Sequence, residues 1–280
     1  MPYTDHGCIS VLMSAYNAAA TLEAAARSVL RQTYENLELI LCDDGSTDGT
    51  WEIVRRLAAE DGRVVCFQNG RNLGLGASLN RCLARARGEL IARQDADDLS
   101  DPARLERTAA FLLASGAPYV GCGVRVFDDA GVWSRRMFPQ KITAHTIAQK
   151  NPFFHPTMLF RRAVLENAGG YSESDDTRRA EDYDLVMRLA GQGLIGENLP
   201  EILYSVYEPE AAYRRRTVRS RLCEIAVRAR GLRAMHAPIY DAVYLAKPLL
   251  MALVPCGLLK PLKRLQWAAP DGVRKEMKRL

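Results

Sequence analysis

The first half of the chain alternates short apolar runs with stretches in which apolar residues recur at helical spacing. The apolar runs predict buried strands at 8–14, 37–42, 63–68 and 89–93. The stretches between them predict helices at 21–31, 48–60 and 76–87, with Asp48 as the cap of the second. Asp101-Pro102 then opens another helix, as a cap followed by proline does. Strands that alternate with helices predict βαβ units and a mainly parallel, Rossmann-like sheet flanked by helices.

The pattern changes after residue 118. Two apolar runs at 119–127 and 132–138 flank Asp128-Asp129-Ala130-Gly131, which predicts a hairpin. Beyond it the spacing predicts a strand at 157–160 and helices at 143–150, 161–168 and 181–190. We therefore expect an α/β domain at 1–213, divided into halves at 1–118 and 119–213.

Composition and charge separate this domain from the rest of the chain. The 280 residues are 48% hydrophobic and 25% charged, which is typical of globular proteins. Residues 1–213 hold 22 Lys and Arg against 29 Asp and Glu, whereas 214–280 hold 16 against 4. The basic C-terminal region, 214–280, is expected to be helical and to meet an anionic partner, either membrane lipid or nucleic acid.

Within the basic C-terminal region, residues 239–259 are mostly apolar but include Asp241, Lys247, Pro248 and Pro255. A spanning helix needs about 20 predominantly apolar residues, so this segment is a poor candidate for one. Because Lys and Arg residues follow it, we expect it to lie on an anionic membrane surface. The alternative is a pair of helices packed on the domain or on a second copy of the chain in a homo-oligomer.

The N-terminus and the cysteines indicate the compartment. The first residues, MPYTDH, show neither the basic nor the apolar region of a secretory signal. Seven cysteines are scattered, mostly inside apolar runs, which indicates reduced thiols. We expect a cytoplasmic catalytic region that is peripheral at the inner face of the cell membrane.

Polar and acidic clusters follow three of the predicted strands. Ser14-Ala15-Tyr16-Asn17 follows the first, Asp43-Asp44 the second, and Asp95-Ala96-Asp97-Asp98 the fourth. Ligands of an open parallel sheet bind at the carboxyl ends of its strands, so these clusters should share one rim. Neighbouring carboxylates repel each other, and a hard divalent cation relieves this. The rim therefore predicts a Mg²⁺ or Mn²⁺ site that takes carboxylates and substrate phosphates.

Other chemistry is excluded by missing motifs. There is no G-x-x-x-x-G-K-[ST] loop, no H-E-x-x-H pair and no G-x-S-x-G turn. Gly74-Leu75-Gly76 is a fragment of a dinucleotide fingerprint away from the first strand, which argues against a dehydrogenase.

An ordered set of motifs resembles the inverting family 2 glycosyltransferases with the GT-A fold. The set runs from ISVLMSAYN and CDDGSTD through Asn72-Leu73-Gly74 and the Asp95–Asp98 cluster to His155-Pro156-Thr157 and Glu181-Asp182. It covers roughly residues 8–205 and departs from the family at Ser14-Ala15, where a Pro-Thr or Pro-Ser pair is common.

The resemblance implies a role for each matching residue. Ser14, Tyr16 and Asp44 would hold the nucleobase and its surroundings, Arg71 would close over the base, and Asp95 would touch the ribose. Asp97 would bind the metal, and Asp182 would be the catalytic base. His155 and Glu181 would contact the acceptor or support the site. Read from spacing alone, Glu181 and Asp182 could equally be acids that favour a helix N-terminus.

The expected activity is transfer of a sugar from a uridine or thymidine diphosphate sugar to a hydroxyl. The acceptor would be a glycan or lipid-linked glycan in cell-surface polysaccharide synthesis. One alternative is a sugar-phosphate nucleotidyltransferase, although 14–20 lack the basic residue such enzymes carry after the first strand. The other is a non-catalytic nucleotide-binding or nucleic-acid-binding protein. The basic C-terminal region lacks the interleaved aromatics of nucleic-acid binding, so no nucleic-acid partner is expected.

Overall fold

The computed structural model describes residues 7–209 and 218–248. Its strands form one sheet in the order β3-β2-β1-β4-β8-β6-β9-β5, with β7 paired to β6. The strands are β1 (Ile9–Ala15), β2 (Leu37–Asp43), β3 (Val64–Gln68), β4 (Leu90–Asp95), β5 (Leu99–Ser100), β6 (Tyr119–Asp128), β7 (Gly131–Arg136), β8 (Leu159–Arg161) and β9 (Glu197–Tyr207).

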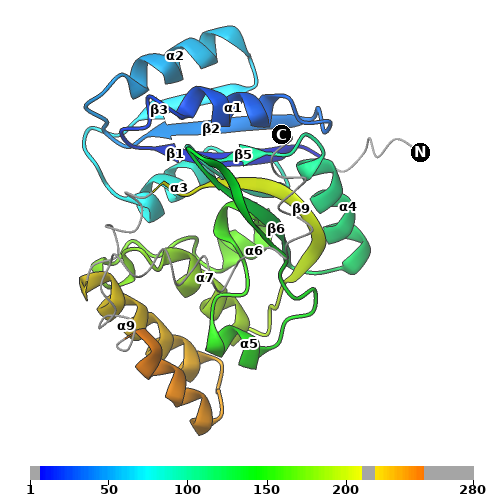
Figure 1. The fold of residues 1–280 in the computed structure, drawn as a ribbon, viewed down its shortest axis with the longest axis vertical. Helices are drawn as coiled ribbons and strands as arrows, with labels where there is room; N and C mark the ends of the chain where they lie inside the picture. Colours follow the sequence, from blue (N-terminus) through cyan, green and yellow to red (C-terminus); the bar gives the residue numbers. More distant parts are fainter. Residues whose placement is uncertain (1–6, 210–217, 249–280) are drawn as a thin grey trace.

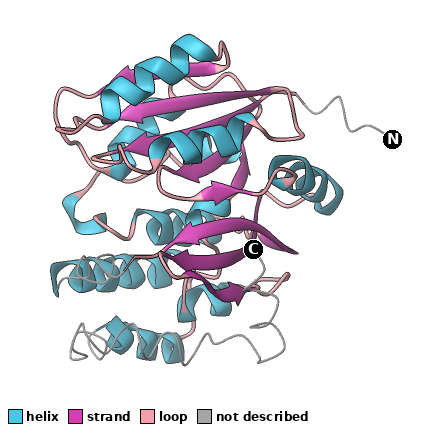
Figure 2. Ribbon diagram, turned by 45° about the horizontal axis from the view of Figure 1, so that its top comes forward, coloured by secondary structure: helices cyan, strands magenta, loops and turns pink. Residues whose placement is uncertain are grey.

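Helices cover both faces of this sheet, as Figures 1 and 2 show. The α-helices are α1 (Leu22–Leu30), α2 (Thr50–Glu60), α3 (Leu75–Leu83), α4 (Arg104–Ser115), α5 (Ala144–Gln149), α6 (Arg162–Asn167), α7 (Glu181–Gly191) and α9 (Val218–Ala234). Three short 3₁₀ segments are η1 (His155–Thr157), η2 (Asp175–Thr177) and η3 (Ile239–Leu245).

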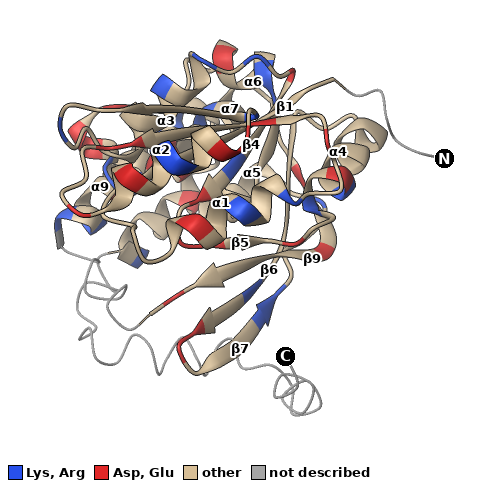
Figure 3. Cartoon of the chain, turned by 90° about the horizontal axis from the view of Figure 1, so that it is seen from above, with Lys and Arg blue, Asp and Glu red and all other residues tan. Residues whose placement is uncertain are grey.

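The alternation of side chains along β1 builds two separate cores. Val11 and Met13 join the core under α1, α2 and α4, whereas Leu12 points to the core under α3, α5, α6, α7 and α9. Successive residues of a strand face opposite sides, so one apolar strand supplies both cores. The Lys, Arg, Asp and Glu positions fall mostly on the helices and loops rather than along the central strands (Figure 3).

Strands β3, β2, β1 and β4 are parallel, and the chain reverses its direction of travel across the sheet between β1 and β4. The parallel prediction is therefore confirmed in this half. Such a reversal leaves a crevice outside the carboxyl ends of the two strands, where open α/β sheets bind ligands. In the other half β8 is antiparallel to both β4 and β6, while β6 and β9 are parallel.

Two helices begin later than the sequence pattern predicts. Helix α2 starts at Thr50 rather than at Asp48, although the Asp48 carboxylate accepts the Thr50 amide at 3.0 Å. Helix α4 starts at Arg104, and Asp101 accepts the Ala103 amide at 3.2 Å. Both aspartates therefore accept a backbone amide near the N-terminus of the helix that follows them. Strand β9 was not predicted, because its sequence ENLPEILYSVY does not alternate and holds Pro200.

The described part of the basic C-terminal region packs on the domain. Gly231 of α9 faces Met187 of α7 so closely that a Cβ there would lie 2.2 Å from the Met187 sulfur. On η3, Asp241 is buried and accepts a 2.7 Å contact from His145 Nδ1 of α5. Residues 239–248 therefore contact α5 through Asp241 while Ile239, Tyr240 and Val243 stay exposed, and 249–280 lie outside the described residues. Within 7–209 and 218–248, none of the helices is long and apolar enough to span a bilayer.

Candidate active site

A cleft opens at the carboxyl ends of β1 and β4, at the reversal point of the sheet. Ser14 and Asp95 are register partners on these two strands, and both line the cleft with Tyr16, Asp97 and Tyr207. The Tyr16 side chain is 49% exposed, which is high for an aromatic residue. An exposed ring beside polar groups is suited to stack on a planar base. The predicted rim of Ser14, Tyr16, Asp95 and Asp97 is therefore assembled as the sequence indicates.

The carboxylates of Asp95, Asp97 and Asp98 form a tight acidic cluster. One ligand oxygen from each lies within 4.8 Å of the others, and the three range from buried Asp98 to exposed Asp97. Burial and the charges of its two neighbours raise the pKa of Asp98 well above its ordinary value. Three convergent carboxylate oxygens suit a hard divalent cation, so these residues fit Mg²⁺ or Mn²⁺.

A buried arginine, Arg93, hydrogen-bonds to one carboxylate of this cluster. Arg93 is 1% exposed, and its guanidinium donates to the Asp95 carboxylate and to the Gln94 carbonyl. The Asp95 backbone amide donates to the Tyr204 hydroxyl of β9 at 3.1 Å. Asp95 is therefore held from two elements, and its orientation does not depend on a ligand.

Asp44 lies under a loop rather than in the cleft. The side chain is 2% exposed, and its oxygens accept the amides of Leu73 at 2.8 Å and Gly74 at 2.9 Å. The neighbouring Gly45 has φ +71°, and a Cβ there would lie 2.6 Å from the Arg71 carbonyl carbon. Asp44 and Gly45 thus shape the loop that carries exposed Arg71. Asp44 therefore hydrogen-bonds to this loop and does not line the cleft itself.

Asp182 is the second residue of α7 and sits in an environment that favours its neutral form. Burial is the larger cause and the Glu181 charge the next, and together they raise the pKa of Asp182 to about 6. Asn151 Nδ2 donates to Asp182 Oδ2 at 2.9 Å, which acts in the opposite direction. A carboxylate with a pKa close to the working pH is suited to general base catalysis.

A second, smaller cleft lies at the start of α7, where Glu181, the residue before Asp182, forms part of its wall. Glu181 lines it together with Gly76 at the start of α3 and with the segment 172–178. Carboxyl, hydroxyl and guanidinium groups share its wall, since Ser172, Glu173 and Arg178 also line it. Such a mixed polar wall is suited to sugar hydroxyl groups.

His155 is buried and packs edge-on against Tyr171. Its Nε2 lies 2.9 Å from the Tyr171 hydroxyl, and burial together with the nearby Arg93 charge lowers the pKa of His155 well below its ordinary value. The pKa of Tyr171 is raised by burial, and it is sensitive to Arg93, Asp182 and Asp95 in turn. The Tyr171 hydroxyl is therefore close enough to respond to the charges of both Asp95 and Asp182. At 8% exposure, His155 offers little surface to an acceptor.

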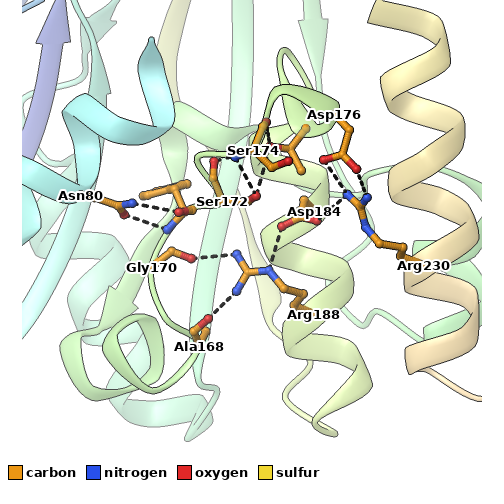
Figure 4. A network of polar contacts seen from close by, with 11 residues as sticks. Asn80, Ala168, Gly170, Ser172, Ser174, Asp176, Asp184, Arg188 and Arg230 are labelled. Carbon is orange, nitrogen blue, oxygen red and sulfur yellow. Dashed lines mark hydrogen bonds and ion pairs between the residues drawn. The ribbon is translucent and has the colours of Figure 1, made fainter. Parts of the chain in front are cut away.

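A polar network fixes the segment that carries Tyr171 (Figure 4). Asn80 of α3 exchanges two hydrogen bonds with the Tyr171 backbone, each of 2.8 Å. Arg188 of α7 donates to the carbonyls of Ala168 and Gly170 and pairs with Asp184. The second half of α3, the segment 168–171 and α7 are therefore held as one unit.

Sequence reasoning assigned no role to several residues that the structure brings to the site. Tyr204 and Tyr207 come from the unpredicted strand β9, and Asn151 comes from the turn after α5. Asp98 stands inside the Asp95–Asp98 motif, but no role was assigned to it. For Asn151 and the tyrosines of β9 no local signal existed, because their partners are distant in the chain.

Comparison with known proteins places the chain in context. The family model described as "Glycosyl transferase family 2" matches residues 10–169. The putative glycosyltransferase EpsE of Bacillus subtilis is 41% identical over 253 residues, which cover 90% of this chain and 91% of EpsE. The protein named UDP-Glc:alpha-D-GlcNAc-diphosphoundecaprenol beta-1,3-glucosyltransferase WfaP, of Escherichia coli, is 41% identical over 201 residues, covering 71% of this chain and 77% of WfaP.

Solved structures show the same fold. The mannosyltransferase PcManGT of Pyrobaculum calidifontis, in complex with GDP-Man and Mn²⁺, has a TM-score of 0.65 at 20% identity, covering 98% of this chain and 84% of that chain. TarS 1–349 of S. aureus, in complex with UDP-GlcNAc, has a TM-score of 0.64 at 22% identity, covering 86% and 71%.

Proposed function

The chain belongs to glycosyl transferase family 2 and is a glycosyltransferase; on that premise we propose that it transfers a hexose from a uridine diphosphate sugar, with inversion, to a lipid-linked glycan. The family assignment argues against both a nucleotidyltransferase and a non-catalytic binding protein. The cleft between the ends of β1 and β4, with the acidic cluster at its rim, is the observation that carries the proposal.

The donor occupies the cleft at the ends of β1 and β4. The nucleobase stacks on Tyr16 beside Ser14, the ribose lies against Asp95, and Arg71 closes over the nucleotide from its loop. Uridine is favoured over thymidine because WfaP, 41% identical, is named for UDP-glucose. Asp44 contributes by holding the Arg71 loop through the amides of Leu73 and Gly74.

The acidic cluster holds the divalent cation, with Asp97 as its principal ligand. A bound cation stabilises the negative charge that the departing nucleoside diphosphate gains. Arg93 keeps the Asp95 carboxylate in place, and Asp98 ties the cluster to the Tyr207 amide at 2.8 Å. The cation is proposed as Mg²⁺ or Mn²⁺.

Asp182 accepts the proton of the attacking hydroxyl. As the acceptor oxygen bonds to the anomeric carbon, the bond from that carbon to the diphosphate oxygen breaks, and the hydroxyl proton passes to Asp182. A single displacement of this kind inverts the anomeric configuration. The acceptor sugar enters by the second cleft, where Glu181 and Ser172 can bind its hydroxyl groups.

The acceptor's lipid places the reaction at an anionic membrane surface, the inner face of the cell membrane. On η3 the side chains of Ile239, Tyr240 and Val243 are 89%, 65% and 66% exposed, and the basic stretch 260–279 follows them. Exposed apolar groups beside lysines and arginines suit an interface with anionic lipids. Deleting residues 239–280 should release the protein from vesicles that contain phosphatidylglycerol; unchanged binding would contradict the membrane assignment.

A screen of nucleotide sugars tests the activity. The wild-type protein is incubated with UDP-, dTDP- and GDP-sugars and Mn²⁺ or Mg²⁺, and thermal protection and nucleotide release are followed. We expect protection by UDP-hexoses that disappears with EDTA. Release of pyrophosphate from a nucleoside triphosphate and a sugar phosphate would instead support a nucleotidyltransferase.

A further inference from the structure

The basic C-terminal region contributes one buried arginine to the interior of the domain. Arg228 of α9 is 2% exposed, although its helix belongs to a region with a large excess of positive charge. Its Nε and Nη2 donate to Glu224 at 3.2 and 3.0 Å, which balances the charge. The third nitrogen, Nη1, points away from α9 towards α5.

Arg228 holds the end of α5. Nη1 donates to the Ala148 carbonyl at 2.9 Å and to the Gln149 carbonyl at 3.4 Å. The last carbonyls of a helix have no partner within it, so a buried cation at this position both satisfies and stabilises them. The chain leaves α5 here, and Asn151 follows two residues after Gln149.

Arg228 also holds the start of α7. Its guanidinium carbon lies 4.9 Å from the centre of the Tyr183 ring, within the range of a cation–π contact. The Tyr183 hydroxyl donates to the carbonyls of Ile147 and Ala148 at 2.5 and 3.3 Å. Arg228 thus contacts Tyr183 of α7, and both residues bind the last turn of α5.

These contacts flank the hydrogen bond from Asn151 to Asp182. Asn151 follows the turn that Arg228 holds, and Asp182 precedes the ring on which Arg228 stacks. We propose that Arg228 is a positioning residue for Asp182: it sets α5 and α7 at the spacing that the Asn151–Asp182 hydrogen bond requires. This inference rests on the proposed role of Asp182 as the base. Arg228 thus gives α9, which lies beyond residues 10–169 that the family model matches, a residue that positions Asp182.

The test substitutes Arg228→Gln and measures kcat, the donor KM and the dissociation constant of UDP. A displacement of about 1 Å at a catalytic group can cost on the order of 100-fold in rate. We therefore expect kcat to fall about 10- to 100-fold, while the donor KM and the UDP affinity remain within a factor of about two, since the nucleotide cleft lies on other elements. Arg228→Lys, which keeps the charge and a donor, should recover part of kcat.

Arg221→Gln is the matched control. Arg221 lies on the same helix and contacts the same partner, Glu224, at 3.5 Å, and this contact lies within α9. Its kcat should equal that of the wild type.

A second readout follows the acid limb of the pH–rate profile. The hydrogen bond from Asn151 lowers the pKa of Asp182, whereas Glu181 on the same helix raises it. The charge of Asp182 also raises the pKa of Tyr171 and of Tyr183. Arg228→Gln and Asn151→Ala should both move the acid limb to higher pH. Their combined effect on kcat should be smaller than the product of the two separate effects.

Three outcomes decide between the claims. Wild-type kcat in Arg228→Gln would overturn the positioning role, as would equal losses of kcat and UDP affinity. If Arg228→Gln does not melt cooperatively, Asn151→Ala decides instead: wild-type kcat and an unmoved acid limb in that variant would overturn the positioning role, because Arg228 is proposed to act through the Asn151–Asp182 hydrogen bond. Turnover by Asp182→Asn, measured alongside, would instead contradict Asp182 as the base. Arg228 would then have no catalytic residue to position.

Discussion

Asn151 Nδ2 donates to Asp182 Oδ2 over 2.9 Å, and this joins the turn after α5 to the start of α7. The bond opposes the two influences that raise the pKa of Asp182, burial first and the Glu181 charge second. Asp182 is therefore held in one orientation while its pKa stays at about 6. A base in this setting is deprotonated at neutral pH and still basic enough to take a proton.

The pH dependence of the reaction follows from this pKa. The base must be charged, so kcat should fall as pH drops below about 6 and should lose about tenfold for each further pH unit. Initial rates between pH 4.5 and 8 at saturating donor measure the limb. A limb near pH 4, the ordinary range of an aspartate, would contradict the assigned environment.

Asp182→Asn should stabilise the fold at neutral pH. The folded pKa lies above the ordinary value, so the folded state binds more protons and loses stability as pH rises from about 4 through about 6. Asparagine does not ionise, and its amide oxygen can still accept from Asn151. We expect the Tm of the variant to exceed that of the wild type by a few degrees at pH 7.5, and the difference to vanish near pH 4. Equal melting at both pH values would show that the charge is not buried.

Asp97→Asn should weaken binding of the divalent cation without abolishing nucleotide binding. Asp97 is the exposed member of the acidic cluster, so its loss removes an oxygen ligand and leaves Asp95 and Asp98 in place. The dissociation constant of Mn²⁺ in the presence of UDP should rise by about 10- to 100-fold, as measured by electron paramagnetic resonance. Unaltered Mn²⁺ affinity would assign the metal to other residues.

Gly45→Ala should disturb the loop that carries Arg71. Gly45 has φ +71°, and the added methyl would lie 2.6 Å from the Arg71 backbone, so the loop must move. The strain should cost about 1–3 kcal/mol in the free energy of unfolding and raise the donor KM. Gly70→Ala on the same loop is the control, since a Cβ there meets nothing within 4 Å. Equal donor KM values for Gly45→Ala and Gly70→Ala would show that the position of the Arg71 loop does not affect donor binding.

The parts of the site that could be predicted from sequence are those built by neighbours in the chain. Asp95 and Asp97 follow an apolar run, and the parallel sheet brings that run beside β1, where Asp95 becomes the partner of Ser14. The rim could therefore be predicted from chain order and from the rule that ligands bind at the carboxyl ends of parallel strands. Asp44 was placed on the same rim, but its burial under Gly74 depends on how the loop folds back.

The remaining parts depend on contacts between distant segments. Tyr204 reaches Asp95 from β9, which pairs with β6 through two register shifts and contains Pro200. Neither alternation nor strand propensity marks such a strand. Arg228 stands in a basic stretch that suggests solvent or lipid, and only tertiary packing shows it buried against Tyr183.

The most direct test of the account compares binding and transfer in Asp182→Asn. Calorimetry measures the affinity for UDP with Mn²⁺, and a transfer assay measures sugar incorporation into a lipid-linked acceptor. We expect UDP affinity within about twofold of the wild type, because the nucleotide cleft is built by β1, β4 and β9. Transfer should fall by at least about 100-fold, since general base catalysis contributes about 10²–10⁴-fold. Transfer at the wild-type rate with intact binding would contradict Asp182 as the base.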